Sequence, residues 1–140
     1  MIGNKRTIIL FFITLFVVLF FKWVHHPLPI REGIITIDSL MDTVNVYSDP
    51  YGVPHVFASN ERDLFFTAGY IAAQDRLFQL SMVLLAVRGE LSSVFGKKFL
   101  KTDIYLRTWK IYDTAKVLVS NMDDKNRRIF DSFCKGINYR

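Results

Sequence analysis

The side chains of this 140-residue sequence that could do chemistry are few: Asp75, Arg76, His55 and Cys134. Asp75 and Arg76 lie inside an apolar run, where a charge is costly unless it is paired or hydrogen-bonded. Two interpretations stay open for them. One is a buried ion-pair network that organises helix packing, with Arg88 and Arg107 as candidate partners of the aspartate; the other is a catalytic carboxylate.

His55 and Cys134 carry weaker signals. His55 could act as a base, but the sequence offers it no persuasive serine or aspartate partner, so a structural role is expected. Cys134 is the only cysteine, which excludes an intrachain disulfide and a cysteine metal cluster. Its place on an apolar helical face predicts a small, buried and inert side chain. Since no phosphate loop, paired-carboxylate spacing or zinc signature is present, no catalytic or metal-binding residue is assigned, and substrate-binding residues stay unknown.

A hairpin that contains His55 is predicted first. Asp49-Pro50-Tyr51-Gly52 suits a type I turn, and residues 44–47 alternate in polarity before it. Pro54 cannot donate a ladder bond, which places the second strand at an edge or a bulge. Residues 34–37 contain three isoleucines and could add another strand.

A long helix is predicted next, beginning near Glu61 with Ser59 or Asn60 as the N-cap. Apolar side chains on more than one stripe predict that it is largely buried. Gly89 suits the position after its last turn, and residues 90–95 look like one short helical turn closed by Gly96.

Two more helices follow in the prediction. Residues 98–118 suggest one, and Ser120 with Asp123 resembles a capping box that starts the other. The last helix is expected to place one apolar face inward, made of Met122, Ile129, Phe130, Phe133, Cys134 and Ile137. From the residues alone, the fold class is α+β: a hairpin followed by mainly α-helices.

The first 26 residues have the pattern of an export signal. Lys5 and Arg6 precede an uncharged run over residues 7–21. As a helix the run reaches roughly 22 Å, short of the roughly 30 Å hydrocarbon core, and extending it to residue 24 brings it near spanning length. No alanine occurs before Ala58, which favours an uncleaved signal-anchor in the membrane through residues 7–24 over a cleaved signal peptide. Residues 27–33 then read as a linker.

The net charge of +5 does not indicate a nucleic-acid partner. The first 33 residues hold four Lys and Arg against one acid, so much of the excess belongs to the leader. The remaining basic residues are mixed with acids and are expected on solvated helix faces. They include Lys97, Lys98, Lys101, Arg127 and Arg128.

The middle of the chain resembles the opening of a penicillin acylase. The similarity covers about residues 44–139 and rests on several motifs in one order: Asp49-Pro50-Tyr51-Gly52-Val53-Pro54-His55, Ala58-Ser59-Asn60, Gly69-Tyr70, Ala73-Gln74-Asp75-Arg76-Leu77-Phe78-Gln79, Gly89-Glu90-Leu91-Ser92 and Phe95-Gly96, with weaker agreement at Asp103, Leu106-Arg107-Thr108 and Gly136-Ile137-Asn138. Such a series is more specific than any single short pattern.

This resemblance implies an N-terminal-nucleophile hydrolase with a four-layer αββα architecture. Such a precursor cleaves itself and exposes a serine whose own α-amino group activates it for attack on an amide. In the family this serine opens the second chain, so the nucleophile is expected beyond Arg140, and residues 34–140 are the N-terminal part of the first chain. The partner is then the remainder of the precursor. No cofactor is expected in this chain, while calcium stays open for the full-length parent.

Three functions remain open at this point. The first is the inactive N-terminal piece of an exported amidohydrolase for β-lactam, acyl-homoserine lactone or similar amides. The second is a membrane-anchored, non-catalytic interaction protein derived from an acylase. The third is a small hydrolase that uses His55 or Cys134. If the leader is kept, the protein is expected to be membrane-anchored and to face the periplasm or cell exterior. If the leader is cleaved, it is expected to be periplasmic or secreted.

Overall fold

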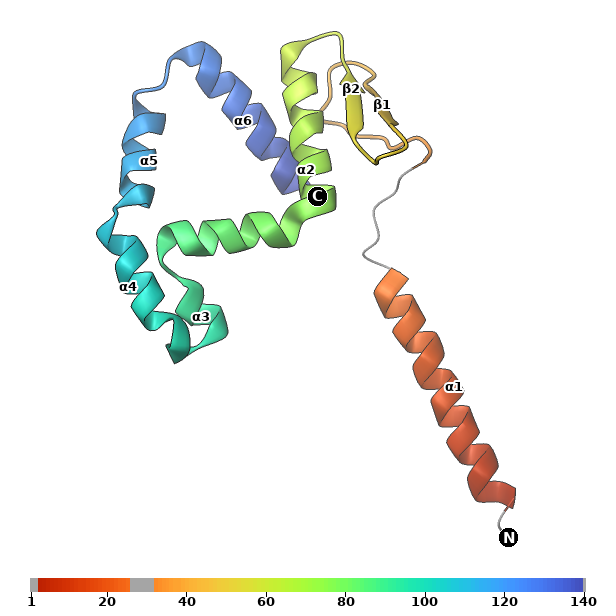
Figure 1. The fold of residues 1–140 in the computed structure, drawn as a ribbon. Coiled ribbons are helices and arrows are strands. Elements are labelled where there is room, and N and C mark those ends of the chain that lie inside the picture. Colours follow the sequence, from red (N-terminus) through yellow and green to blue (C-terminus); the bar gives the residue numbers. More distant parts are fainter. Residues whose placement is uncertain (1–2, 26–31, 140) are drawn as a thin grey trace. The chain divides into compact units, whose positions relative to one another are not determined.

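The computed structural model describes residues 3–25 and 32–139. The chain divides into two compact units, residues 1–35 and 36–140, which are described separately. The elements, labelled in Figure 1, are α1 (Gly3–His25), β1 (Asn45–Ser48), β2 (Pro54–Phe57), α2 (Glu61–Arg88), α3 (Leu91–Phe95), η1 (Lys97–Phe99), α4 (Leu100–Thr108), α5 (Ile111–Ser120) and α6 (Asp124–Tyr139).

The first unit consists mainly of α1, a helix of 23 residues. Its side chains from residue 7 to residue 23 are exposed. Within the described part of the chain, none of the helices has both the length and the apolar character that crossing a membrane requires. The predicted membrane span therefore has no support in the structure.

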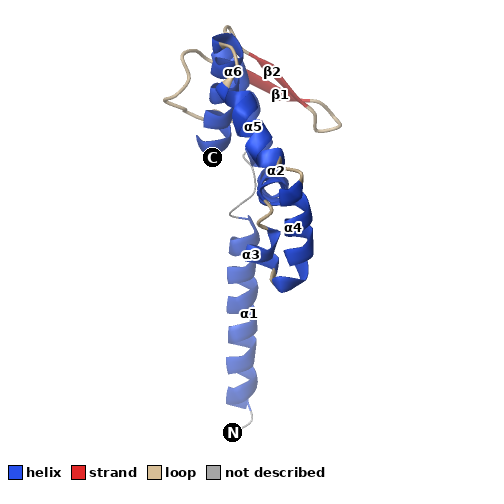
Figure 2. Cartoon of the chain, turned by 90° about the vertical axis from the view of Figure 1, so that its left-hand side faces the viewer, coloured by secondary structure: helices blue, strands red, loops and turns tan. Residues whose placement is uncertain are grey.

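The second unit contains the predicted hairpin, and its other regular elements are helices, as Figure 2 shows. β1 and β2 pair antiparallel, with Tyr47 opposite His55 and Ser48 opposite Pro54. The Asp49 carbonyl accepts a 2.9 Å bond from Gly52 N, and Gly52 has φ +80°, a conformation that favours glycine. The hairpin followed by helices is thus confirmed. Residues 34–37, however, form no strand, and Ile34 is 99% exposed.

Helix α2 has the predicted ends and an unpredicted break. Asn60 is the N-cap, since its side chain accepts a bond from Asp63 N, and Gly89 ends the helix at φ 65°. In between, Arg76 has φ −136° and ψ 23°, outside the helical region. The helix turns sharply at this point in Figure 1. No proline or glycine lies within four residues, so the usual sequence signals of a kink are missing.

The chain after α2 follows the prediction as far as α3 and then departs from it. α3 ends at Gly96 as expected. The predicted helix over residues 98–118 is wrong, because η1, α4 and α5 replace it and Lys110 adopts φ +54° between α4 and α5. A left-handed residue cannot continue a right-handed helix.

Helix α6 is capped by Asp123 and not by Ser120, which corrects the predicted capping box. The Asp123 carboxylate accepts bonds from Asn126 N at 2.9 Å and Asn126 Nδ2 at 2.6 Å, while Ser120 ends α5. The buried face of α6 also differs from the prediction. Ser132 and Gly136 are its most buried residues, whereas Phe130 is 55% exposed.

The core lies where the first half of α2 meets α6. In Figure 1 this part of α2 stands between α6 and the hairpin, and its contacts with α6 are the most extensive between any two elements. We call the hairpin, residues 61–75 of α2 and α6 the closed half. We call residues 76–120, from the kink through α5, the arm. Only two arm residues, Gly89 and Asp103, are buried.

Candidate functional site

The hairpin turn places His55 beside an acid that the sequence analysis did not find. Asp49 Oδ1 accepts bonds from Tyr51 N at 2.9 Å and Val53 N at 2.8 Å. The bond from Val53 is the main cause of a lowered pKa of the Asp49 carboxyl, with Tyr51 and His55 adding to it. His55 Nε2 lies 3.6 Å from Asp49 Oδ2, and its side chain is 55% exposed. The predicted hairpin was the signal that could have revealed this pair, because its register sets His55 opposite Tyr47, two residues before Asp49.

Asp63 ties the segment before the hairpin to the start of α2. It is fully buried and accepts bonds from Met41 N at 3.0 Å, Asp42 N at 2.9 Å and Asn60 Nδ2 at 2.8 Å. Burial alone raises the pKa of this carboxyl, but the bonds from Asn60, Asp42 and Met41 outweigh it, so the pKa is lowered. Asp63 also places negative charge in the first turn of α2, where the helix dipole favours it. The carboxylate thus joins three parts of the chain: residues 41–42, the Asn60 cap and the first turn of α2.

Two glycines let α2 and α6 touch backbone to backbone. A Cβ added at Gly136 would collide with the Phe66 carbonyl and lie 2.8 Å from Tyr70 N, and one at Gly69 would collide with the Phe133 carbonyl. The Tyr139 ring packs edge-on against Phe66 with centroids 5.7 Å apart. The Gly69-Tyr70 and Gly136-Ile137-Asn138 motifs are therefore the two sides of one helix crossing.

Asp75 and Arg76 do not form the predicted buried network. Both side chains are exposed where α2 leaves its packing against α6. Arg76 Nη1 lies 3.4 Å from Gln79 Oε1 in the next turn. The proposed partners of Asp75 are engaged elsewhere: Arg88 lies over the Tyr112 ring at 5.2 Å, and Arg107 Nε donates to the Gly89 carbonyl at 3.0 Å. The prediction of a buried pair is wrong, because the kink turns the pair outward.

Asp103 does at the start of α3 what Asp63 does at the start of α2. It is 2% exposed, and its carboxylate accepts bonds from Leu91 N at 2.9 Å and Ser92 N at 2.7 Å. Burial raises its pKa, but the bonds from Ser92 and Leu91 and the charge of Arg107 outweigh this and lower it. The Gly89-Glu90-Leu91-Ser92 motif thus meets Asp103 and Arg107 in a single junction, although twelve residues separate Leu91 from Asp103.

Cys134 is exposed, which contradicts the predicted burial. The reason is the rotated face of α6, which turns Ser132 and Gly136 inward in its place. Among the described residues, no three His, Cys, Asp or Glu side chains gather in a way that could hold a metal ion.

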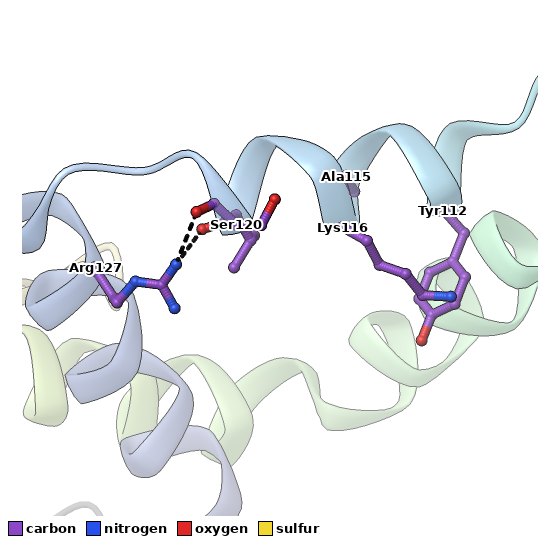
Figure 3. A pocket seen from close by; sticks show the side chains of 6 residues that line it. Tyr112, Ala115, Lys116, Ser120 and Arg127 are labelled. Atoms are coloured by element: carbon purple, nitrogen blue, oxygen red, sulfur yellow. Dashed lines mark hydrogen bonds between the residues drawn. The ribbon is translucent and has the colours of Figure 1, made fainter.

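An open groove of about 480 Å³ lies along α5 and reaches α6 (Figure 3). At one end Arg127 Nη2 donates to the carbonyls of Val119 at 2.6 Å and Ser120 at 3.4 Å, so Arg127 caps α5 and is only partly solvated. At the other end Lys116 Nζ lies 4.2 Å from the Tyr112 ring centroid and 3.6 Å from Asp113 Oδ1. Both cations already have partners, so the groove is not a ready anion site.

These residues therefore position backbone elements. The carboxylates of Asp49, Asp63 and Asp103 all accept backbone N–H groups, and Gly69 and Gly136 allow close packing. His55 and Asp49 are the pair whose side-chain types best suit acid–base catalysis, and they lie at an exposed turn. Asp49 is already committed to the turn amides, so the arrangement builds a scaffold.

Comparison with known proteins agrees with this scaffold. The family model for penicillin amidase matches residues 43–140. Penicillin G acylase from Escherichia coli is 32% identical over 95 residues, which cover 68% of this chain and 11% of that protein. The acyl-homoserine lactone acylase QuiP of Pseudomonas aeruginosa is 28% identical over 111 residues, which cover 79% of this chain and 13% of that protein.

A solved structure shows the same fold. The thermostable penicillin G acylase from Alcaligenes faecalis superposes with a TM-score of 0.62 at 33% identity, covering 69% of this chain and 52% of that chain. This chain spans 11% to 13% of the length of the two curated acylases named above. The matched region includes the hairpin, the helix crossing and both buried aspartates, Asp63 and Asp103. The chain belongs to the penicillin amidase family.

Proposed function

We propose that this chain supplies the N-terminal scaffold of an amidohydrolase that cleaves the amide bond of an N-acylated amine. The observation that carries the proposal is the family match over residues 43–140, within which the motif residues Asp49 and Asp103 accept backbone N–H groups. The names of the relatives refer to penicillin and to acyl-homoserine lactones, which supports this class of substrate.

The attacking serine, in this proposal, belongs to sequence outside these 140 residues, within a four-layer αββα domain. A serine hydroxyl needs an adjacent base and an oxyanion hole. The relatives are several times longer than the segment they share with this chain, so they have ample room for such groups elsewhere. The remainder of the acylase polypeptide is thus the proposed partner.

The test has two arms. The full chain by itself is expected to show no turnover of chromogenic acyl-anilides. Turnover that disappears in His55→Ala or Cys134→Ala would overturn the proposal. In the second arm, residues 43–140 replace the aligned segment of E. coli penicillin G acylase, and the chimera is expected to retain measurable hydrolysis. A chimera that is soluble and folded by circular dichroism but inactive would count against it.

We also propose that residues 1–26 act as an export signal. Lys5 and Arg6 before the uncharged run of α1 support this. A fusion of residues 1–33 to alkaline phosphatase, which is active only after export, is expected to be active. A fusion in which Leu15 and Phe16 are replaced by Lys is the control and should be inactive. Equal activity of both fusions would contradict the proposal.

A further inference from the structure

Charge separates two regions of the second unit. Residues 36–63, which hold the hairpin and the start of α2, contain five Asp and Glu against one Arg. The arm, residues 76–120, contains eight Lys and Arg against three Asp and Glu, a formal +5. Exposed apolar side chains occur in both regions, such as Tyr51 and Phe57 in the hairpin and Phe78 in the arm. The excess of positive charge, and not apolar exposure, therefore sets the arm apart.

Three lysines concentrate this charge where η1 meets α4. Residues 91–102 contain Lys97, Lys98 and Lys101 but no Asp or Glu. All three lysines are exposed, and we call them the lysine cluster. The next residue, Asp103, is 2% exposed, and its carboxylate accepts its bonds from amides at the start of α3. The nearest acid that follows the cluster in the chain is thus already engaged.

The backbone brings the lysine cluster to one side of a helical segment. η1 ends at Phe99, and Leu100 has right-handed helical dihedrals and begins α4, so the helical path continues from one element into the next. Lys101 follows Lys97 by four positions and Lys98 by three, and residues at these spacings are neighbours on a helix surface. In Figure 1, α3 and α4 follow the end of α2 that lies away from the hairpin.

The lysine cluster is not neutralised within the chain. Lys116 of α5 pairs with Asp113 at 3.6 Å, but in the described part of the chain no lysine of the cluster forms an ion pair. Lys98 Nζ lies over the Phe99 ring, 5.3 Å from its centroid. Like charges at neighbouring helix positions repel, and the helix dipole disfavours a cation such as Lys101 in the first turn of α4. An anionic partner would relieve both effects.

The chemistry of the lysine cluster suits a surface of phosphate groups. Ammonium groups are compact point charges, and the cluster does not line the groove along α5. Each lysine close to an anionic bilayer strengthens binding roughly fivefold, so three of them together have a measurable effect. The export proposed above takes the chain across a membrane, so lipid headgroups are a phosphate surface that the chain meets.

We propose that the lysine cluster binds the chain peripherally to an anionic phospholipid surface through the headgroup phosphates. The contact is made in the headgroup layer, so it needs no helix that spans the membrane. This inference goes beyond amide hydrolysis. Its choice of lipid rests on the proposed export signal.

The test measures binding of the full chain to two kinds of vesicle by co-sedimentation. One kind is phosphatidylcholine alone, and the other is an equimolar mixture with anionic phosphatidylglycerol. The apolar, exposed helix α1 can contribute to both, so the comparison isolates the effect of lipid charge. Phosphatidylglycerol should strengthen binding by roughly tenfold or more, and this gain should shrink as salt is added.

Two triple variants locate the gain. The first replaces the lysine cluster and should lose most of the gain while binding to phosphatidylcholine stays unchanged: Lys97→Gln, Lys98→Gln and Lys101→Gln. The second removes the same charge from exposed lysines of α5 and α6 and should keep the gain: Lys116→Gln, Lys125→Gln and Lys135→Gln. Because the net charge is equal in the two variants, any difference between them reports the position of the charge.

Amide hydrogen exchange on the vesicle-bound chain reports on the cluster and not on α1. Exchange over residues 97–103 should be slower on the mixed vesicles than on phosphatidylcholine alone. Four results would overturn the proposal: no gain with phosphatidylglycerol, equal loss in both triple variants, equal exchange over residues 97–103 on both vesicles, or tighter binding to short duplex DNA than to the mixed vesicles.

The export proposal has a separate readout, the alkaline phosphatase fusion. An active fusion without any gain from phosphatidylglycerol would retain the export signal and remove the lipid contact. An inactive fusion with a gain that depends on the lysine cluster would retain the lipid contact and count against the export signal.

Discussion

The closed half and the arm are made of the same kinds of side chains but pack differently. In the closed half, Gly69 and Gly136 bring two helix backbones into contact, and Phe66 is 4% exposed. In the arm, Phe78 is 75% exposed although it lies on the same helix as Phe66. The kink at Arg76 separates the two environments. Burial in this chain thus depends on whether a second helix lies opposite, more than on hydrophobicity.

The largest expected difference in stability is between two variants that each remove a phenyl ring, one before the kink and one after it. Phe66→Ala should lower the free energy of unfolding by about 3–5 kcal/mol, because it leaves a cavity against α6. Phe78→Ala should change it by less than about 0.5 kcal/mol, because the ring is already in water. Urea denaturation of the full chain measures both. Similar losses in the two variants would contradict the distinction.

A methyl group at the helix crossing should act nearly as strongly. Gly→Ala inside a helix normally stabilises by about 1 kcal/mol, so the sign of the effect is informative. Gly136→Ala should instead destabilise by about 3 kcal/mol, because the new Cβ meets the backbone of Phe66 and Tyr70. Asn138→Ala, at an exposed position of α6, is the control. Stabilisation by Gly136→Ala would show that the helices do not cross here.

Loss of the Asp63 charge should cost less, about 2 kcal/mol, because three bonds to a buried carboxylate weaken while the side-chain shape is kept. The lowered folded pKa also fixes the sign of the pH dependence. Its contribution is present above the unfolded value of 3.8 and is lost as the pH falls through the lower folded value. Thermal melts of Asp63→Asn and the unaltered chain should therefore converge in acid. A constant gap would exclude this linkage.

The corresponding change in the arm should have the smallest global effect. Asp103→Asn weakens the bonds to Leu91 N and Ser92 N and should cost about 1 kcal/mol, felt mainly within the arm. Faster amide hydrogen exchange over residues 91–95 is the expected signature. Asp113→Asn, at a side chain that is 71% exposed, is the matched control. A large loss of global stability in Asp103→Asn would show that the arm and the closed half unfold together.

Sequence signals predicted the features that local chemistry controls. The Asp49-Pro50-Tyr51-Gly52 turn, the Asn60 cap and the Gly89 stop were all found, since each depends on neighbouring residues. Features set by distant contacts were missed. Nothing near Arg76 indicates the kink, and the inward face of α6 is set by Gly136 meeting Phe66 across the crossing.

The candidate site divides in the same way. The motifs correctly indicated the family. The roles of Asp63 and Asp103 needed the fold, because the backbone N–H groups that bind these carboxylates lie eleven to twenty-two residues away in the chain. Asp75 and Cys134 were predicted inside because their neighbours in sequence are apolar. Both are outside, since an apolar stretch does not by itself provide a second surface to cover it.

The central claim is that the closed half is held together by its helix crossing, while the arm is loosely packed and exposed. Native-state hydrogen exchange on the full chain tests this most directly. We expect slow, cooperative exchange for amides in residues 61–75 and in α6, and much faster exchange throughout α3, α4 and α5. Equal protection of the arm and the closed half in the isolated chain would contradict the claim.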